Sequence, residues 1–385
     1  MFKRVVHLRG SDAMLGAEKV VLELSRRTAE FGYESIIVAL QGEHDPEPEL
    51  VKLAREAGIQ AEILRCRGRF DPAVFRRLGQ LLRNQQAGLL HCHGYKENFY
   101  GLFAARGLPK IATNHLWKRT SRALRFYCWL DARLIRYFDH VVAVSEPIRQ
   151  ELRAAGVPAH KITRIANGID TTPYRRLSGD AEREALRASL GIPPERLAVG
   201  MVSQLSIEKG HAYALDAIAQ LRSRFPQLLL VIVGDGPELS ALQAAVTRQN
   251  LDQHVLFCGR RSDIANVMQA FDIFLLPSLI EGLPMALLEA MAAGRSAVAS
   301  RVGDVEKAIQ DGTSGLLTPP ADAPALAAAL ARLAASPDLR LNLGRAAAAR
   351  IEQQFSARQM ARQYCRLYDS LQRTPTTVAA WEQEQ

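Results

Sequence analysis

Two glutamates, Glu281 and Glu289, lie in a stretch of the sequence that could bind a polyhydroxylated ligand. Each carboxylate can accept two hydrogen bonds from hydroxyl groups. Between them, Gly282, Leu283 and Pro284 lead into a run of strong helix formers, with Pro284 where a first helical residue is expected. Backbone N–H groups at a helix start suit a phosphate. The stretch therefore predicts a loop that binds hydroxyls and a phosphate together, although an isolated pair with this spacing is more often a solvated loop residue and a helix surface charge.

A short strand and a helix must position the two glutamates. The apolar run 273–276 predicts a buried strand that Pro277 ends, and residues 285–293 predict a helix that Gly294 ends. The same alternation recurs along the chain and predicts doubly wound parallel sheets of the α/β class. The predicted strands are residues 5–8, 36–40, 61–64, 89–93, 111–115, 140–144, 162–165, 198–202, 228–233, 254–257, 273–276, 297–299 and 315–318. Polar residues after these strands are the candidates for ligand contact.

Three further loops carry residues suited to this chemistry. Lys209 stands beside Gly210 before a predicted helix, where a mobile cation would reinforce phosphate-binding N–H groups. Gly16 follows the first predicted strand, where a glycine lets the backbone approach a ligand closely, although a simple strand–helix turn explains it as well. His115 ends another predicted strand, either as a ligand contact or as a structural histidine.

The sequence predicts neither a metal site nor a nicotinamide cofactor. His91 and His93 could face the same way on one predicted strand, but no third ligand is near them in the sequence. The five cysteines are scattered without a C-x-x-C pair, which favours reduced thiols over disulfides or zinc. No G-x-G-x-x-G fingerprint is present.

The length of 385 residues suits two to three domains. The polar residues 171–195, with the paired prolines Pro193 and Pro194, predict a linker. We expect a first domain over residues 1–175, a second over 176–355, a helix over 356–374 that packs back on the first domain, and a tail over 375–385. No apolar run reaches the roughly 18 residues of a spanning helix and no signal-peptide core is present, so a cytoplasmic protein is expected.

The positive charge is confined to the first half of the chain. Residues 1–170 contain 27 Lys+Arg and 18 Asp+Glu, whereas residues 171–385 contain 22 of each. Its densest part is the segment 117–138, in which basic and aromatic residues interleave and Asp131 is the only acid. Such a segment suits an anionic membrane surface, would equally suit stacking on nucleic acid, and is also compatible with a partly buried helix that has a solvated basic face.

The sequence around the two glutamates carries a family resemblance. The block Glu281–Gly294, E-G-L-P-M-A-L-L-E-A-M-A-A-G, closely resembles the donor-site signature of the retaining glycosyltransferases of family 4 (group 1), which have the GT-B fold. Lys209-Gly210 is similar to the end of the family's G-R-L-x-x-x-K-G, with Gln204 where the family has a diphosphate-binding arginine. Weaker matches extend the resemblance over nearly the whole chain.

The resemblance implies a role for each matched position. Glu289 would hold the ribose hydroxyls, Glu281 the donor sugar, and His115 would contact the transferred sugar. Lys209, with N–H groups near Gly16 and Gly282, would neutralise the departing diphosphate. The implied catalytic residues are Glu281, His115 and Lys209, and the implied donor-binding residues are Gly16, Gln204, Lys209, Arg260, Glu281, Gly282, Leu283, Pro284 and Glu289.

The resemblance also implies a fold and a reaction. The fold would be GT-B, with two Rossmann-like doubly wound domains facing a cleft and a C-terminal helix that crosses back to the first domain. The reaction would be hexosyl transfer with retention, from a nucleotide-sugar to a glycan or lipid-linked glycan acceptor, in cell-surface polysaccharide or lipopolysaccharide assembly. The nucleotide-sugar is a substrate, so no cofactor and no bound metal are required. The location would be the cytoplasm or the inner face of the cytoplasmic membrane, through residues 117–138.

Two alternatives to this reaction stay open from the sequence. One is a nucleotide-sugar epimerase or phosphorylase on the same fold, which would alter the sugar without a glycan acceptor. The other is a basic, non-catalytic binding protein whose cleft has degenerated around Gln204. Nothing besides charge favours the second, and nucleic acid is not an expected partner.

Overall fold

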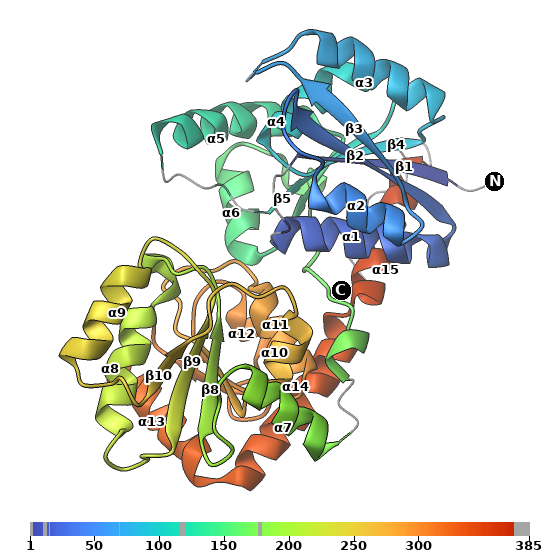
Figure 1. Ribbon diagram of the computed structural model, residues 1–385. Coiled ribbons are helices and arrows are strands. Elements are labelled where there is room, and N and C mark those ends of the chain that lie inside the picture. Colours follow the sequence, from blue (N-terminus) through green and yellow to red (C-terminus); the bar gives the residue numbers. More distant parts are fainter. Residues whose placement is uncertain are drawn as a thin grey trace. The chain divides into compact units, whose positions relative to one another are not determined.

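The computed structural model describes residues 3–10, 14, 16–68, 70–115, 117, 121–175 and 179–372. The described chain forms two compact units. Unit 1 comprises the residues up to Gly168 and those from Ala357 onward, and unit 2 comprises Ile169–Ser356. Figure 1 shows that each unit is a sheet covered by helices.

Unit 1 contains a seven-stranded parallel sheet in the order β3-β2-β1-β4-β5-β6-β7. The strands are β1 (Lys3–Arg9), β2 (Tyr33–Gly42), β3 (Gln60–Cys66), β4 (Leu89–Cys92), β5 (Lys110–Asn114), β6 (His140–Ala143) and β7 (Ile162–Arg164). The helices are α1 (Gly16–Thr28), α2 (Glu49–Glu56), α3 (Ala73–Asn84), α4 (Tyr95–Ala104), α5 (Arg122–Leu134), α6 (Glu146–Ala154) and α15 (Ala357–Gln372). Both faces of the sheet are buried: Ile36 and Val38 belong to one apolar core, and the intervening Ile37 belongs with Ala39 to another.

Unit 2 contains a six-stranded parallel sheet in the order β10-β9-β8-β11-β12-β13. The strands are β8 (Leu197–Val202), β9 (Leu228–Val233), β10 (Val255–Phe257), β11 (Ile273–Leu276), β12 (Ser296–Ser300) and β13 (Leu316–Thr318). The helices are α7 (Asp180–Ser189), α8 (His211–Leu221), α9 (Leu239–Arg248), α10 (Ile264–Ala270), α11 (Met285–Ala292), α12 (Val305–Ala308), α13 (Ala323–Ala335) and α14 (Pro337–Gln354).

The predicted α/β class with doubly wound sheets is confirmed. In each sheet the strand order reverses once, between β1 and β4 in unit 1 and between β8 and β11 in unit 2. All the predicted strands are present within a few residues of their expected limits, and several of them, such as β9 and β11, are short, fully buried apolar runs. Parallel sheets of this kind bind ligands at the carboxyl ends of the strands beside the reversal.

The predicted return of the last helix to the first unit is also confirmed. Two buried tyrosines of α15 hydrogen-bond into the sheet of unit 1: the hydroxyl of Tyr368 lies 2.8 Å from Nδ1 of His91, and that of Tyr364 lies 3.1 Å from Oγ1 of Thr113. At the end of the same helix, the hydroxyl of Tyr33 donates to Asp369 over 2.8 Å. The C-terminal helix is therefore an integral part of unit 1.

The segment predicted as a linker, residues 171–195, contains the helix α7. The sequence of α7 is polar and has no apolar stripe. Ion pairs hold this helix against the rest of unit 2 instead. The guanidinium groups of Arg183 and Arg187 lie 2.6 and 3.1 Å from the carboxylate of Asp272, the residue before β11. Arg187 is buried, and it also donates to the backbone oxygens of Pro193 and Arg196.

The structure describes part of the basic and aromatic segment and none of the predicted tail. The basic and aromatic segment 117–138 forms α5 and a 3₁₀ turn, Ile135–Tyr137, while Lys118, Arg119 and Thr120 lie outside the described residues, as does the predicted tail. Of the helices within the described residues, none has both the length and the apolar character needed to cross a bilayer.

Candidate functional site

The loops after β8 and β11, at the reversal point of unit 2, bring Lys209 and Glu281 together. The ammonium nitrogen of Lys209 donates to Oε1 of Glu281 over 2.6 Å, and the hydroxyl of Ser278 donates to the same oxygen over 2.8 Å. The side chain of Glu281 is only 9% exposed, whereas that of Lys209 is 27% exposed. Glu281 is therefore not a solvated loop residue, and the lysine is the member of the pair that an incoming anion would meet first.

Backbone contacts hold these two loops in place. Gly210 has φ +68°, and a Cβ there would lie 2.0 Å from the carbonyl oxygen of Pro277. Gly303 has φ +55°, and a Cβ there would lie 2.1 Å from the carbonyl oxygen of Glu281. The N–H of Asp304 also donates to the carbonyl oxygen of Gly282 over 2.8 Å. Only glycine fits at positions 210 and 303, and Gly303 was not singled out from the sequence.

The remaining predicted donor-binding residues of unit 2 divide into buried and exposed ones. Glu289, on α11, is 3% exposed, so it is not a helix surface charge. Pro284 and Leu283 are buried before the same helix, and Pro284 is its N-cap. Gln204 and Arg260 are exposed in the loops after β8 and β10. The helix start, the buried carboxylate and the two exposed side chains lie on loops or helices that follow the carboxyl ends of parallel strands, where a phosphate and hydroxyls would be bound.

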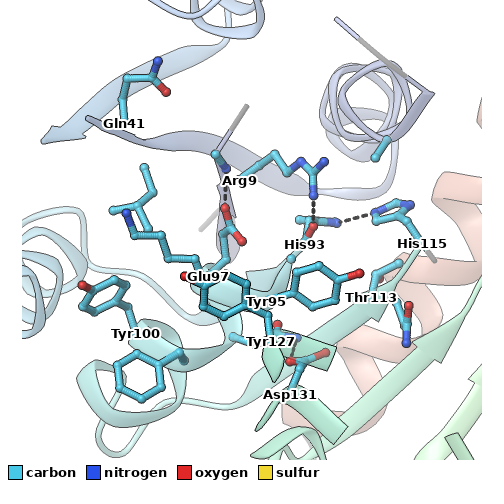
Figure 2. Close-up of a pocket in the computed structure, with 18 of the residues that line it drawn as sticks. Arg9, Gln41, His93, Tyr95, Glu97, Tyr100, Thr113, His115, Tyr127 and Asp131 are labelled. Atoms are coloured by element: carbon cyan, nitrogen blue, oxygen red, sulfur yellow. Dashed lines mark hydrogen bonds between the residues drawn. The ribbon is translucent and has the colours of Figure 1, made fainter. Parts of the chain in front are cut away.

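Unit 1 has its own cavity, of about 880 Å³, at the reversal point between β1 and β4 (Figure 2). It is lined by two predicted residues, Gly16 and His115, and by six aromatic residues: Phe70, Tyr95, Phe99, Tyr100, Phe126 and Tyr127. Among the described residues, four acids line it, Glu18, Asp45, Glu97 and Asp131, against two cations, Arg9 and Lys96. Although the first half of the chain is basic, the described wall of the cavity is therefore acidic and aromatic.

Two of these acids are held by hydrogen bonds at the cavity wall. The N–H of Gly10 donates to Glu97 over 2.7 Å, and a Cβ on Gly94 would lie 2.2 Å from the same carboxyl group. Asp131 accepts from Asn98 and from the indole of Trp117, each over 2.8 Å. Burial raises the pKa of Glu97, and it raises the pKa of Asp131 to about 6.

Two buried amide side chains of the cavity have a polar atom without a protein partner among the described residues. Asn98 is 2% exposed and Asn114 is 5% exposed. Within the described part of the chain, no hydrogen bond reaches Oδ1 of Asn98 or Nδ2 of Asn114, and both residues line the cavity. Buried amide groups normally have hydrogen-bond partners. Among the residues that the structure describes, the oxygen of Asn98 lacks a donor and the nitrogen of Asn114 lacks an acceptor. A hydroxyl group can both donate and accept, so the pair points to a ligand that carries neutral hydroxyl groups.

A histidine cluster lies at the inner side of the cavity, on adjacent strands. His7, on β1, pairs in register with His91, on β4, and Nδ1 of His7 lies 3.1 Å from Nε2 of His93. Figure 2 shows His93 pointing to His115, whose Nε2 lies 3.3 Å from Nδ1 of His93. Burial lowers the pKa of His7 and of His115 to about 3, and it lowers those of His91 and His93 well below the usual value. All four imidazoles are neutral at neutral pH.

His7 corrects the expectation that no third histidine accompanies His91 and His93. One ring nitrogen from each of these three residues lies within 4.8 Å of the other two. Each of the six nitrogens already has a hydrogen-bond partner, so a metal ion would have to displace several of them. The pairing of β1 with β4 is what brings His7 here, and sequence spacing alone carries no sign of it.

Comparisons with known proteins assign the chain to one family. The family model described as "Glycosyltransferase Family 4" matches residues 15–173, and the one described as "Glycosyl transferases group 1" matches residues 182–350. The chain is 28% identical over 368 residues to a phosphatidyl-myo-inositol mannosyltransferase of Mycolicibacterium smegmatis, covering 92% of this chain and 90% of that protein. It is 29% identical over 254 residues to the UDP-Gal:alpha-D-GlcNAc-diphosphoundecaprenol alpha-1,3-galactosyltransferase of Escherichia coli, covering 62% and 64%. The crystal structure of Anabaena Alr3699/HepE in complex with UDP superposes with a TM-score of 0.82 at 23% identity, covering 95% of this chain and all of that one.

Proposed function

Since the chain belongs to the group 1, family 4 glycosyltransferases and has the GT-B fold, we propose that it transfers a hexosyl group, with retention, from a nucleotide-sugar to a neutral sugar unit of a glycan or lipid-linked glycan. The observation that carries this proposal is the Lys209–Glu281 pair at the reversal point of unit 2. The biological context that we propose is polysaccharide or glycolipid assembly, in line with the names of the two relatives.

The donor would be bound in unit 2. The ammonium group of Lys209 and the N–H groups at the start of α11 offer positive charge to a diphosphate. Glu281 would then accept hydroxyls of the donor sugar, and the buried Glu289 would accept those of the ribose. We propose a uridine nucleotide first, because the Anabaena structure contains UDP and the Escherichia coli relative is named for UDP-Gal. Gln204, which can donate hydrogen bonds without charge, would contact the same diphosphate.

The acceptor would be bound in the cavity of unit 1. Its aromatic side chains suit the apolar face of a sugar ring, and the free amide atoms of Asn98 and Asn114 suit its hydroxyls. Among the described lining residues, four acids against two cations disfavour a phosphate in the cavity itself. We therefore place an uncharged sugar ring of the acceptor here, with any lipid diphosphate outside.

The charge that develops in the transfer step is on the leaving diphosphate. Lys209 would stabilise this charge electrostatically, and the leaving phosphate would take the proton of the acceptor hydroxyl. In this scheme no protein carboxylate acts as a general acid or base, and neither a metal nor a cofactor supplies a step. His115, neutral at neutral pH, would bind a sugar hydroxyl without taking its proton.

A ligand-dependent stability measurement tests this proposal. Binding to the folded state raises the apparent stability by about 2.7 kcal/mol at a hundredfold excess over the dissociation constant. We expect thermal unfolding of the full chain to shift upward with one nucleotide-sugar of a panel that varies both base and sugar, and with neutral glycosides in a second panel. The matching pair, incubated together, should give the free nucleotide and a product with retained anomeric configuration.

The outcomes separate the parts of the proposal. A shift by nucleotide-sugars with release of an altered sugar and no acceptor consumption would contradict transfer in favour of an epimerase. Shifts by glycosyl phosphates but by no neutral glycoside would contradict the assignment of the unit 1 cavity to an uncharged ring. An absence of any shift across the nucleotide-sugar panel would contradict the donor site.

We propose that α5 contacts an anionic membrane surface. Four residues of one exposed stripe, Arg122, Arg125, Phe126 and Trp129, combine basic and aromatic side chains, and Phe126 and Trp129 are 57% and 49% exposed. The ring of Trp129 also lies 4.1 Å from the guanidinium carbon of Arg133. A helix with this face would place rings at the headgroup level and cations on lipid phosphates.

Reversing two charges of this stripe tests the contact. Arg122→Glu together with Arg125→Glu should weaken binding to phosphatidylglycerol vesicles about 30-fold or more, since each basic residue near the surface contributes about 1 kcal/mol. The matched control is Arg76→Glu with Arg83→Glu, an equal charge change on the exposed side of α3. Equal vesicle binding by the two double variants would show that α5 is no specific contact.

A further inference from the structure

The histidine cluster of unit 1 belongs to a continuous hydrogen-bonded relay that starts at the cavity. From His115 the relay passes to His93 and then to His7, over the distances given above. Nε2 of His7 lies 3.1 Å from Oγ of Ser35, and that oxygen lies 2.8 Å from Oγ1 of Thr28. We define these five residues as the relay; it leads from the cavity past the end of β4, and through β1 and β2, to the end of α1.

The far end of the relay fixes its direction. The hydroxyl of Thr28 donates to the backbone carbonyl oxygen of Ser25 over 3.1 Å, and a carbonyl can only accept. Thr28 has a single hydroxyl hydrogen, so in its contact with Ser35 it must accept. Ser35 then donates to Thr28, and it must accept from Nε2–H of His7.

The donor and acceptor nitrogens of the three histidine rings can be assigned in the same way. A neutral imidazole has one N–H and one acceptor nitrogen. His7 donates through Nε2, so its Nδ1 accepts from Nε2–H of His93. Nδ1 of His93 in turn accepts from Nε2–H of His115. The one tautomer of His115 that completes this chain leaves its Nδ1 as an acceptor, and no hydrogen bond from a described residue reaches that atom.

We infer that Thr28, Ser35, His7 and His93 are positioning residues that lock His115 in its Nε2–H tautomer, so that its Nδ1 accepts a hydrogen bond from a hydroxyl of the bound sugar. The relay is a lock and not a route for protons, because it ends at a backbone carbonyl that cannot take a proton onward. The tautomer is a property of the ligand-free protein. Only its effect on catalysis rests on the proposed sugar transfer.

The cavity around His115 favours such a lock. Thr113, Asn114 and His93 line the same cavity as His115, and among the described residues the amide nitrogen of Asn114 has no hydrogen-bond acceptor. A neighbouring donor and acceptor can bind two hydroxyls of one ring. In the opposite tautomer Nδ1 would donate instead, and it would face a hydroxyl oxygen rather than a hydroxyl hydrogen.

Substitution of Thr28 tests the relay from a residue that does not line the cavity. The ¹⁵N spectrum of histidine-labelled full-length protein distinguishes Nε2–H from Nδ1–H imidazoles, and a His115→Gln spectrum assigns the His115 signals. We expect the Nε2–H pattern for His115 in the parent and in Thr28→Ser. Thr28→Val removes the anchoring hydroxyl and should give a mixture of both tautomers, with kcat/KM for sugar transfer about tenfold lower.

Ser25→Ala is the matched control. The side-chain hydroxyl of Ser25 has no hydrogen-bond partner among the described residues, whereas its backbone carbonyl, which anchors the relay, stays in place. This variant should keep the tautomer of His115. If Thr28→Val does not fold, Ser35→Ala breaks the relay one step further along and is expected to give the same mixture.

The results separate the relay from the proposed function. An unchanged Nε2–H pattern in folded Thr28→Val and Ser35→Ala would overturn the relay, even if activity fell, because a purely structural effect would leave the tautomer alone. An Nδ1–H pattern in the parent would overturn it as well. Inactivity of the parent with every donor, together with the expected tautomers, would instead contradict only the proposed sugar transfer.

Discussion

Replacing Lys209 by alanine should lower the turnover of the nucleotide-sugar about 10²- to 10³-fold. Lys209 is the more exposed member of the Lys209–Glu281 pair, so its ammonium group is open to a ligand. In the variant, Glu281 keeps a second hydrogen-bond partner, Ser278. Removing one preorganised donor to a developing negative charge has an effect of this size in other enzymes. The measurement is nucleotide release under saturating acceptor, with the donor KM determined separately so that loss of binding and loss of rate are distinguished.

The controls for this variant are in the same unit. Lys307→Ala removes an exposed lysine of α12 and should leave turnover unchanged. Lys209→Arg keeps the charge and should recover part of the activity, which a merely structural lysine–glutamate contact would not require. Parent-like turnover of Lys209→Ala, in a variant whose unfolding temperature is also unchanged, would remove Lys209 from the proposed site.

The secondary structure was predictable because it depends on local patterns. Fully buried strands such as β9 and β11 are uninterrupted apolar runs, and turns with glycine or proline end them. Helix α7 was missed because its stability comes from ion pairs with Asp272, which is far away in the sequence. Helix α4 was not predicted either, since its mixture of aromatic and charged residues has no clear period.

The candidate site was predictable only where it is contiguous in the sequence. Glu281, Glu289 and Lys209 stand in short motifs next to glycines, so their residue types and spacing were informative. His7 and Gly303 were missed for a different reason: each acts on a partner that strand pairing or loop packing brings near. The charge of the first half was also misleading for the cavity, because a net charge says nothing about which side chains line a given wall.

Unit 1 should lose stability steeply as the pH falls from about 6.5 to 4. Four of its histidines, His7, His91, His93 and His140, are almost completely buried, and burial lowers the pKa of each; for His140 the value is about 4. In the unfolded chain a histidine binds its proton near pH 6.5. Below that pH the unfolded state binds protons that the folded state excludes, so the stability present above pH 6.5 is lost toward the folded pKa values.

Two carboxyl groups act in the opposite direction, but they are too few to prevent the loss. The pKa values of Glu97 and Asp131 are raised, so in the folded state they bind protons before the unfolded chain does, and they add stability as the pH falls toward 4. Each group contributes up to about 1.4 kcal/mol per pH unit. With His115, five histidines of lowered pKa stand against these two carboxyls, so the stability of unit 1 falls on balance as the pH is lowered from about 6.5 to 4.

Tryptophan fluorescence can follow this loss in unit 1 alone, because residues 169–356 contain no tryptophan. We expect the urea midpoint from fluorescence to fall sharply between pH 6.5 and 4.5. Unit 2 has a single buried histidine with a lowered pKa among its described residues, His211. The part of the circular-dichroism transition that comes from unit 2 should therefore shift less with pH. His140→Gln, a substitution outside the relay, should reduce the pH dependence of the free energy of unfolding of unit 1 by the contribution of about one proton. A fluorescence midpoint that is constant over this range would mean that these histidines are protonated in the folded protein, and the neutral relay to His115 would then be wrong as well.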